Sequence, residues 1–362
     1  MNKKMKILDL FCGAGGLSLG FEKAGFQIVG GVEFDSEIIE THVKNFPKAI
    51  NICDDIKKIS NKKVTSLFKN KVDGIIGGPP CQGFSAANKQ QSEKEKKEKN
   101  RLFYEYIRFI RLLKPKFFVI ENVKQILTKE NGYAKKHIYE ITSKLGYRVS
   151  SEVLTASDYG VPQKRQRAII VGIRKDLGFE FDFKTIKKAQ KVNVYEAISD
   201  LYPIDNLANP SSVTRITRRP RSAYQILMRK NSKDRLYNHE VKYPIAKIQN
   251  RIRHVPQGGN WTDVPERLWD TKRLNRHSSA YRRLSEDDFS ITIDTGHMNY
   301  FHPIYDRVPT VRESARLQSF PDDFIFVGNK TCQYTQVGNA VPPLMAQALA
   351  KAIRKKINNA KK

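Results

Sequence analysis

The 362-residue chain has few cysteines, no long apolar run, and far fewer acidic than basic residues. Its four cysteines (Cys12, Cys53, Cys81 and Cys332) lie far apart and form no Cys-x-x-Cys pair. This spacing argues against a metal site and a disulfide framework, and it is typical of a reducing cytoplasm. No apolar run reaches the roughly 18 residues that a membrane span needs. The basic N-terminus is followed by a segment too short and too acidic for a signal peptide.

Positive charge dominates the composition. Lysine and arginine number 65 against 37 acidic residues, which gives a formal net charge of +28. A field of this sign suits a polyanion such as DNA or RNA. A generally lysine-rich proteome would explain scattered lysines, but not a local cluster. One such cluster lies between Arg215 and Arg235, where Asp234 is the only acidic residue. Its members are Arg215, Arg218, Arg219, Arg221, Arg229, Lys230, Lys233 and Arg235.

Apolar, strand-like runs alternate with helical stretches over the first half of the chain. Two helices are predicted, over Leu17–Lys23 and Leu102–Leu113, and a third over Pro342–Lys356 near the C-terminus. The pattern predicts an α/β fold with a doubly wound, largely parallel sheet of about seven strands. The predicted strands are Met5–Leu10, Ile28–Glu33, Ala49–Cys53, Val72–Ile76, Phe117–Glu121, Tyr147–Ala156 and Ala168–Ile173. Residues 176–290 lack this alternation, which indicates a second, smaller domain, mostly irregular or β, with a basic face.

The segment Gly77–Ser85 presents a cysteine on a stiff turn. Two glycines and two prolines follow the predicted strand Val72–Ile76 and end it. In an open α/β sheet, reactive groups lie beyond the carboxyl ends of the strands, so Cys81 is well placed for chemistry. A buried cysteine on a structural turn is the alternative. The charged segment Lys89–Asn100 comes next, and it is either a solvated stretch or a flap over the site.

A glycine-rich turn follows the first predicted strand, in the segment Asp9–Gly20. Such a turn lets the backbone approach a ligand, and the helix after it offers free N–H groups. Ser18 replaces the third small residue of a dinucleotide-binding turn, and the carboxylate of Asp9 would repel a pyrophosphate but attract a cation. Glu33 ends the next strand and could bind a ribose, while Asp55-Ile56 could hold an adenine. The sequence therefore indicates an adenosine-containing cofactor without phosphates.

Two further segments carry polar groups at strand ends. Glu121 ends a very apolar strand, where burial would raise its pKa and suit it to donate a proton. An acid that caps the next helix is the alternative. Gln163, Arg165 and Arg167 alternate along the start of another strand and would share one face. Two guanidiniums on one face suit a base or a phosphate, although surface charge on an edge strand is the alternative.

Taken together, these segments resemble the DNA cytosine-5 methyltransferases of bacterial restriction–modification systems. The matching segments occur in the family's order: Asp9–Gly20, Gly77–Ser85, Glu121–Val123, Gln163–Arg167, Arg307–Pro321 and Gln336–Pro343. The resemblance implies a Rossmann-like catalytic domain at residues 1–180, a DNA target-recognition domain at 181–325, and a segment at 326–362 that returns to the catalytic domain.

The same resemblance implies a role for each matching residue. Cys81 would be the nucleophile, assisted by Glu121, Arg165 and Arg167. Gln82 and Ser85 would contact the substrate base. The residues expected around the cofactor, S-adenosylmethionine, are Phe11, Gly13, Gly15, Gly16, Leu17, Glu33, Phe34, Asp55, Ile56, Pro79, Leu102, Asn339 and Ala340.

The implied activity is transfer of a methyl group to C5 of a cytosine flipped out of a specific duplex site. The expected protein is a cytoplasmic, nucleoid-associated bacterial monomer that protects DNA from a separately acting restriction endonuclease. A tRNA cytosine-5 methyltransferase with the same core is the nearest alternative. A nicotinamide-dependent oxidoreductase and an inactive DNA-binding protein on this scaffold are less consistent with the intact motifs and with Ser18.

Overall fold

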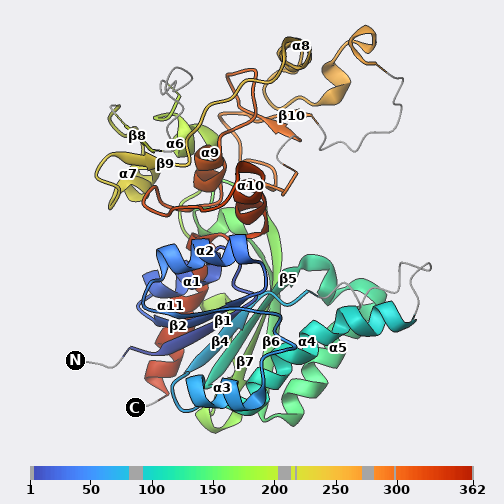
Figure 1. Ribbon diagram of the computed structural model, residues 1–362, viewed down its shortest axis with the longest axis vertical. Helices are drawn as coiled ribbons and strands as arrows, with labels where there is room; N and C mark the ends of the chain where they lie inside the picture. The colour runs from blue at the N-terminus through green and yellow to red at the C-terminus, as the bar shows by residue number, and fades with distance from the viewer. Residues whose placement is uncertain are drawn as a thin grey trace. The chain divides into compact units, whose positions relative to one another are not determined.

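The structure is a computed structural model that describes residues 4–80, 93–202, 213–216, 218–270, 281–296 and 299–360. The chain divides into two compact units, both composed of non-contiguous segments (Figure 1). The first unit contains Met1–Thr155, Gln166–Ala189 and Val341–Lys362, and the second contains Ala156–Arg165 and Gln190–Ala340. The functional division at residues 180 and 325 remains a prediction.

A seven-stranded sheet forms the centre of the first unit, as the apolar runs predicted (Figure 1). Its strand order is β3-β2-β1-β4-β5-β7-β6, and β7 runs antiparallel to both of its neighbours. The other adjacent pairs are parallel. The strands are β1 (Lys6–Leu10), β2 (Gln27–Glu33), β3 (Ile50–Cys53), β4 (Gly74–Gly77), β5 (Phe117–Val123), β6 (Tyr147–Thr155) and β7 (Gln166–Arg174).

Helices cover both faces of this sheet. Adjacent side chains of a strand point to opposite faces, so a strand of consecutive apolar residues has apolar side chains on both. Phe118 packs into a buried cluster with residues of α3, α4 and α5, whereas the ring of Phe117 stacks on Phe21 of α1. Both faces of β5 are therefore apolar, as is typical of a central strand in a doubly wound sheet. The helices of this unit are α1 (Gly16–Lys23), α2 (Ser36–Asn45), α3 (Asn61–Phe68), α4 (Glu93–Leu113), α5 (Lys129–Lys144) and α11 (Pro343–Asn359).

Helix α4 begins nine residues before the predicted start at Leu102. The prediction followed the apolar residues, whereas Glu93–Asn100 is a run of lysine, glutamate and asparagine that includes good helix formers. Residues 93–100 of the predicted flap are therefore helical, and residues 89–92 lie outside the described part of the chain.

The described residues of the second unit form short helices and two small sheets, in which β8 pairs with β9 and β10 with β11. Its core is unusually ionic. The buried guanidinium of Arg316 bonds to Asp200 and Asp322, and that of Arg307 bonds to Glu313. The elements are α6 (Val194–Ile198), β8 (Val213–Arg215), α7 (Ala223–Arg229), β9 (Arg235–Tyr237), α8 (Ala246–Arg253), β10 (Arg282–Arg283), β11 (Tyr300–Phe301), α9 (Val311–Leu317) and α10 (Lys330–Asn339).

Within the described ranges, no helix combines the length and the apolar character needed to cross a lipid bilayer.

Candidate functional site

The predicted site residues of the first unit lie at the carboxyl edge of the parallel strands. Strand β1 pairs Leu10 with Val32 of β2 on one side and with Gly77 of β4 on the other. Gly77 in turn pairs with Ile120 of β5. The segments after these four positions therefore leave the sheet side by side, where ligands bind in open α/β sheets.

The glycine-rich turn between β1 and α1 is fixed by Glu33 at the end of β2. One carboxylate oxygen of Glu33 accepts a hydrogen bond from the Gly13 N–H at 3.0 Å, and the other accepts from the Phe34 N–H at 2.9 Å. Burial raises the pKa of this carboxyl. Gly15 has a φ of 98°, which favours glycine, and α1 begins at the next residue without a side-chain cap. Gly15 has no side chain that could cap the first N–H groups of α1.

The surface beside this turn includes an aromatic ring that packing does not explain. Phe34 follows Glu33 directly and is 74% exposed. Asp55 follows β3 and is partly exposed, and its carboxylate caps Lys57 N and pairs with the Lys57 ammonium at 3.2 Å. An exposed ring and a carboxylate near a strand end suit an aromatic base with an amino group. Ile56 and Leu17, by contrast, are buried, while Phe11 and Leu102 are partly buried against the core.

Strands β4 and β5 bring the proline turn and Glu121 together. The Asn122 side-chain amide donates to the Pro79 carbonyl at 2.9 Å. A Cβ on Gly78 would lie 2.9 Å from Glu121 Oε2, so glycine makes room for that carboxylate. Cys81, Gln82 and Ser85 lie outside the described residues, but Cys81 follows Pro79 by two positions.

Glu121 forms an ion pair with Arg167 of the antiparallel strand β7. Arg167 Nε lies 2.9 Å from Glu121 Oε1, and the two side chains are only 17% and 12% exposed. The ion pair thus joins the end of β5 to the antiparallel strand β7. The sequence located both residues but did not predict that they pair.

The prediction that Gln163, Arg165 and Arg167 share one strand face is wrong. Strand β7 begins at Gln166, and residues 156–165 belong to the second unit. Gln163 instead donates to the Leu317 carbonyl at 3.2 Å, and Arg165 donates to the carbonyls of Ile293 and Gly338. Period-two alternation cannot reveal such contacts, because their partners lie more than a hundred residues away in the chain.

Asn339 and Ala340 belong to the second unit, where Asn339 is the exposed last residue of α10. The Ala340 carbonyl accepts a hydrogen bond from the Gln318 side chain at 2.8 Å. Their predicted role at the cofactor remains a prediction.

Asp9 does not lie at the surface of the turn, where its charge would attract a cation. It is fully buried, and its carboxyl lies 2.7 Å from the hydroxyl of Ser18 in α1. Ser18 in turn lies 3.1 Å from Nε2 of His42. One residue type indicated this arrangement beforehand: the polar Ser18 in place of a small apolar residue. His42 carried no signal that separates it from a surface residue of α2.

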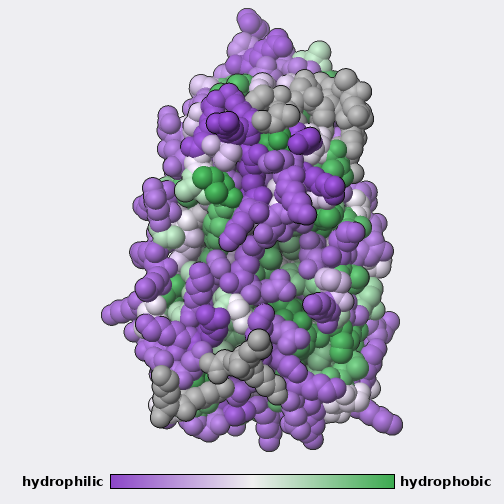
Figure 2. Space-filling view, turned by 90° about the vertical axis from the view of Figure 1, so that its left-hand side faces the viewer, coloured by the Kyte–Doolittle hydropathy of each residue, from purple (hydrophilic) through white to green (hydrophobic). Residues whose placement is uncertain are grey.

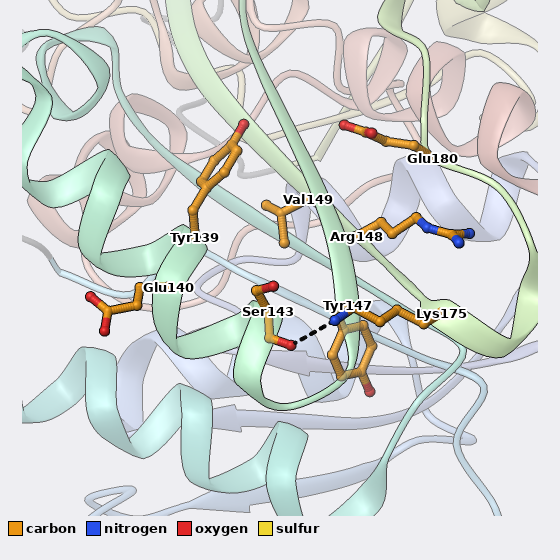
Figure 3. Close-up of a pocket in the computed structure, with 8 residues that line it drawn as sticks. All are labelled: Tyr139, Glu140, Ser143, Tyr147, Arg148, Val149, Lys175 and Glu180. Carbon is orange, nitrogen blue, oxygen red and sulfur yellow. Dashed lines mark hydrogen bonds between the residues drawn. The ribbon is translucent and has the colours of Figure 1, made fainter.

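A pocket of about 410 Å³ opens elsewhere in the first unit (Figure 3). Lys175 Nζ, at one of its walls, donates to the Ser143 carbonyl at 3.2 Å. Tyr147 begins β6, which runs parallel to β5, so the pocket lies at the edge where the parallel strands begin. It is not part of the site at the carboxyl edge. Its lining residues are Tyr139, Glu140, Ser143, Tyr147, Arg148, Val149, Lys175 and Glu180.

The basic cluster of the second unit is largely exposed. Most of its members are at the surface, but Arg229 donates to the Arg218 carbonyl and to Asp234, so it has a structural role. Figure 2 shows a face of the molecule on which hydrophilic residues predominate and hydrophobic ones form separate patches. The exposed members are Arg215, Arg219, Arg221, Lys230, Lys233 and Arg235.

The fold occurs in a solved structure of related sequence, a putative DNA modification methyltransferase encoded within an E. coli prophage. Its TM-score is 0.79 at 27% identity, and the match covers 98% of this chain and 100% of that one. The sheet and the residues at its carboxyl edge thus define the class of the protein as an α/β methyltransferase.

Two relatives of known type match over nearly the whole chain. Type II methyltransferase M1.HphI of Haemophilus parahaemolyticus is 37% identical over 353 residues, which cover 97% of this chain and 87% of the relative. Type II methyltransferase M.DdeI of Desulfomicrobium norvegicum is 37% identical over 372 residues, with coverage of 96% and 88%. The profile of the C-5 cytosine-specific DNA methylases matches residues 5–355. The chain therefore belongs to the C-5 cytosine-specific DNA methylase family and is a DNA cytosine-5 methyltransferase.

This result confirms the predicted activity and the predicted α/β fold. It supports DNA over tRNA as the substrate and gives no support to the nicotinamide-dependent alternative.

Proposed function

We propose that this methyltransferase takes its methyl group from S-adenosylmethionine, held at the glycine-rich turn. The groups around the turn suit this donor. A Cβ on Gly13 would meet open space, so the turn is open to a ligand at that position. Three backbone N–H groups, those of Gly13, Phe34 and Asp35, orient the Glu33 carboxylate, which keeps a lone pair for ribose hydroxyls. The exposed ring of Phe34 offers a face on which an adenine can stack.

The residues that would hold the donor are those predicted from the family resemblance. Glu33 would bind the ribose, Phe34, Asp55 and Ile56 the adenine, and the turn the methionine part. When bound, S-adenosylmethionine supplies an electrophilic methyl group on a cationic sulfur. The proposed cofactor contacts are Phe11, Gly13, Gly15, Gly16, Leu17, Glu33, Phe34, Asp55, Ile56, Pro79, Leu102, Asn339 and Ala340.

Cys81 is proposed as the nucleophile that makes C5 of cytosine reactive. Its thiolate would form a bond to C6, and the electron pair of the C5–C6 double bond would move toward C5 and N3. Glu121 is proposed to hydrogen-bond or protonate N3 and so to stabilise that charge. After methylation, loss of the C5 proton would return the electron pair to the ring and release Cys81. A free thiol has a pKa near about 8.5, so a nearby cation or helix N-terminus is needed to ionise it.

The observation that carries this mechanism is the junction of β4 and β5. The bond from Asn122 to the Pro79 carbonyl and the close approach of Gly78 to Glu121 tie the two strand exits together. Cys81 comes two residues after Pro79 in the sequence, and we propose that it acts together with Glu121. Arg167 is proposed to hold Glu121 in place, and Arg165 to act at the cysteine side of the base.

The second unit is proposed to bind duplex DNA through its exposed basic residues. Phosphate contacts would fix the position of the duplex, and arginines that reach guanine edges would specify sequence. Cytosine cannot reach Cys81 inside a duplex, so it must be flipped out, with Gln82, Ser85 and the segment at 89–100 close to the extruded base. We expect a cytoplasmic, nucleoid-associated bacterial monomer whose methylation blocks a separately acting restriction endonuclease.

Methylation of duplex DNA with labelled S-adenosylmethionine tests the proposal. Wild-type protein should label the DNA, and bisulfite sequencing should place 5-methylcytosine at a single sequence context. Cys81→Ala should abolish transfer and still retain specific DNA in a gel-shift assay. Ser66→Ala, which alters an exposed hydroxyl on α3, is the matched control. Normal turnover by Cys81→Ala, or preferential labelling of tRNA, would contradict the proposal.

A further inference from the structure

A buried chain of hydrogen bonds links four elements around the glycine-rich turn. Asp9 of β1 contacts Ser18 of α1, Ser18 contacts His42 of α2, and His42 contacts Asn51 of β3. The corresponding distances are 2.7, 3.1 and 2.6 Å. Asp9, Ser18 and His42 are all completely buried. The turn lies between the first two members, so its geometry is coupled to this chain.

Two glycines make room for the histidine. A Cβ on Gly15, in the turn itself, would lie 3.0 Å from His42 Cδ2 and 2.5 Å from the Phe46 ring. A Cβ on Gly31 of β2 would lie 2.7 Å from His42 Cε1 and 3.1 Å from Asn51 Oδ1. The imidazole thus packs directly against the backbone of the turn. A shift of His42 would move the residues that are proposed to hold the methyl donor.

The donor and acceptor of each hydrogen bond in this series can be assigned by starting from Asn51. The Asn51 amide nitrogen donates to the carbonyls of Phe46 and Ala49, so Asn51 Oδ1 faces His42 Nδ1 as an acceptor. Nδ1 therefore carries a proton, and in a neutral imidazole Nε2 must accept from Ser18. A hydroxyl has one proton to give. The remaining bond, between Ser18 Oγ and Asp9 Oδ2, is then complete when the carboxyl of Asp9 is protonated and donates.

The surroundings favour this neutral arrangement over an ion pair. Burial raises the pKa of Asp9 to about 7 and lowers that of His42 to about 4. The titratable groups that face Asp9 are Glu33 of β2, Cys12 of the turn and Tyr106 of α4. Burial raises the pKa of each of them, so none supplies a positive charge that would stabilise an Asp9 carboxylate.

We propose that Asp9, Ser18 and His42 are positioning residues for the methyl donor, and that the turn has its binding geometry when Asp9 is the protonated end of the chain. The inference rests on the proposed function of the turn in holding S-adenosylmethionine. When Asp9 loses its proton, the single Ser18 hydroxyl faces two acceptors, the Asp9 carboxylate and His42 Nε2, and can donate to only one of them. Affinity for the donor should then fall as the pH rises.

Calorimetric binding of S-adenosylmethionine and of S-adenosylhomocysteine at pH 6.0 and pH 8.5 tests this inference. The full chain is used as wild type, Asp9→Asn, Ser18→Ala and, as a matched control, Ser66→Ala. Asparagine can donate its amide proton to Ser18 at any pH, so it imitates the protonated acid. The comparison of wild type with Asp9→Asn at each pH cancels the titration of the ligand's own amino group, which occurs near about pH 8.

The expected result is a pH-dependent gap between wild type and Asp9→Asn. Near pH 6 the two should bind within about threefold. At pH 8.5 wild type should bind up to about 30-fold more weakly than Asp9→Asn, because with a pKa near 7 only about one Asp9 in 30 is still protonated. Ser18→Ala should bind both ligands at least about tenfold more weakly at pH 6, whereas its turnover at saturating donor should change less than threefold. Ser66→Ala should behave as wild type.

Three results would overturn the inference. Ser18→Ala could bind as tightly as Ser66→Ala. Wild type could gain affinity relative to Asp9→Asn as the pH rises. Asp9→Asn could lose affinity for S-adenosylmethionine alone, which would make Asp9 an anionic partner of the sulfonium. If Ser18→Ala does not fold, the affinity difference between wild type and Asp9→Asn at the two pH values decides by itself. Binding of neither ligand by wild type would instead refute the proposed function of the turn, a distinct result.

Discussion

Replacement of Arg167 by methionine removes the cation that accompanies Glu121 and keeps much of the side-chain volume. The pair joins β5 and β7 at 2.9 Å, and both side chains are largely buried. A solvent-exposed pair contributes about 0–1 kcal/mol, whereas loss of one partner from a fully buried pair costs about 3–5 kcal/mol. With 17% and 12% exposure, we expect Arg167→Met to lower the free energy of unfolding by about 2–3 kcal/mol.

The same change should reduce methyl transfer more than it reduces DNA or donor binding. Without its partner, Glu121 loses a fixed orientation, and displacement of a catalytic group by about 1 Å can lower the rate about 100-fold. Urea unfolding and single-turnover methylation of duplex DNA measure the two effects separately. A double-mutant cycle with Glu121→Gln should give a coupling of about 1–3 kcal/mol in stability, because contacting residues do not contribute additively.

Arg174→Met is the matched control for this experiment. Arg174 lies on the same strand and pairs with Asp176 at 2.7 Å, but the two side chains are 34% and 58% exposed. We expect its loss to change stability by at most about 1 kcal/mol and the transfer rate hardly at all. Equal stability losses for Arg167→Met and Arg174→Met, together with normal transfer by both, would refute the reasoning.

Three further predictions follow from other parts of the structure. Gly20→Ala should destabilise the protein by about 1–3 kcal/mol in urea unfolding although alanine favours helices, since its Cβ would lie 2.7 Å from the Pro343 carbonyl oxygen; unchanged stability would contradict this packing. Phe34→Ala should weaken S-adenosylhomocysteine binding about tenfold by calorimetry yet change stability by less than about 0.5 kcal/mol, because the ring is exposed; unchanged affinity would remove it from the adenine site. Burial lowers the pKa of His42 to about 4 and of His302 to about 3, so their contribution to stability is complete above the unfolded value near 6.5 and is lost as the pH falls. Asp9, whose pKa is raised to about 7, contributes in the opposite direction, but the two histidines together have the larger effect. The urea midpoint should therefore fall from pH 6.5 to pH 4, and a midpoint that stays flat or rises would contradict this.

The sequence predicted the elements that carry the site because their signals are local. The run Phe117–Ile120 is apolar on both faces, and the structure contains it as the buried part of β5. The turn after β1 needs residues that tolerate a positive φ, and glycines at positions 13 and 15 meet that need. The proline turn after β4 likewise follows from residue types that end a strand.

Partners that are distant in sequence were decided by the tertiary structure. Arg165 and Arg167 differ by two positions, yet one donates to carbonyls of the second unit and the other pairs with Glu121. Arg307, Arg312 and Arg316 contribute to the basic composition, but they are buried in ionic and carbonyl contacts. Composition records that a charge exists and not where the fold places it.

The amino-acid sequence by itself determined where the seven strands of the sheet lie along the chain, the glycine-rich and proline turns, and the family to which the enzyme belongs. Each of these depends on residue type and on spacing along the chain. The tertiary structure decided which polar groups face each other: Glu121 with Arg167, Glu33 with the turn, and Asp9 with Ser18 and His42. The physical reason is that burial and hydrogen bonding depend on neighbours from other strands and helices, and those neighbours alone set the charge and orientation of a group.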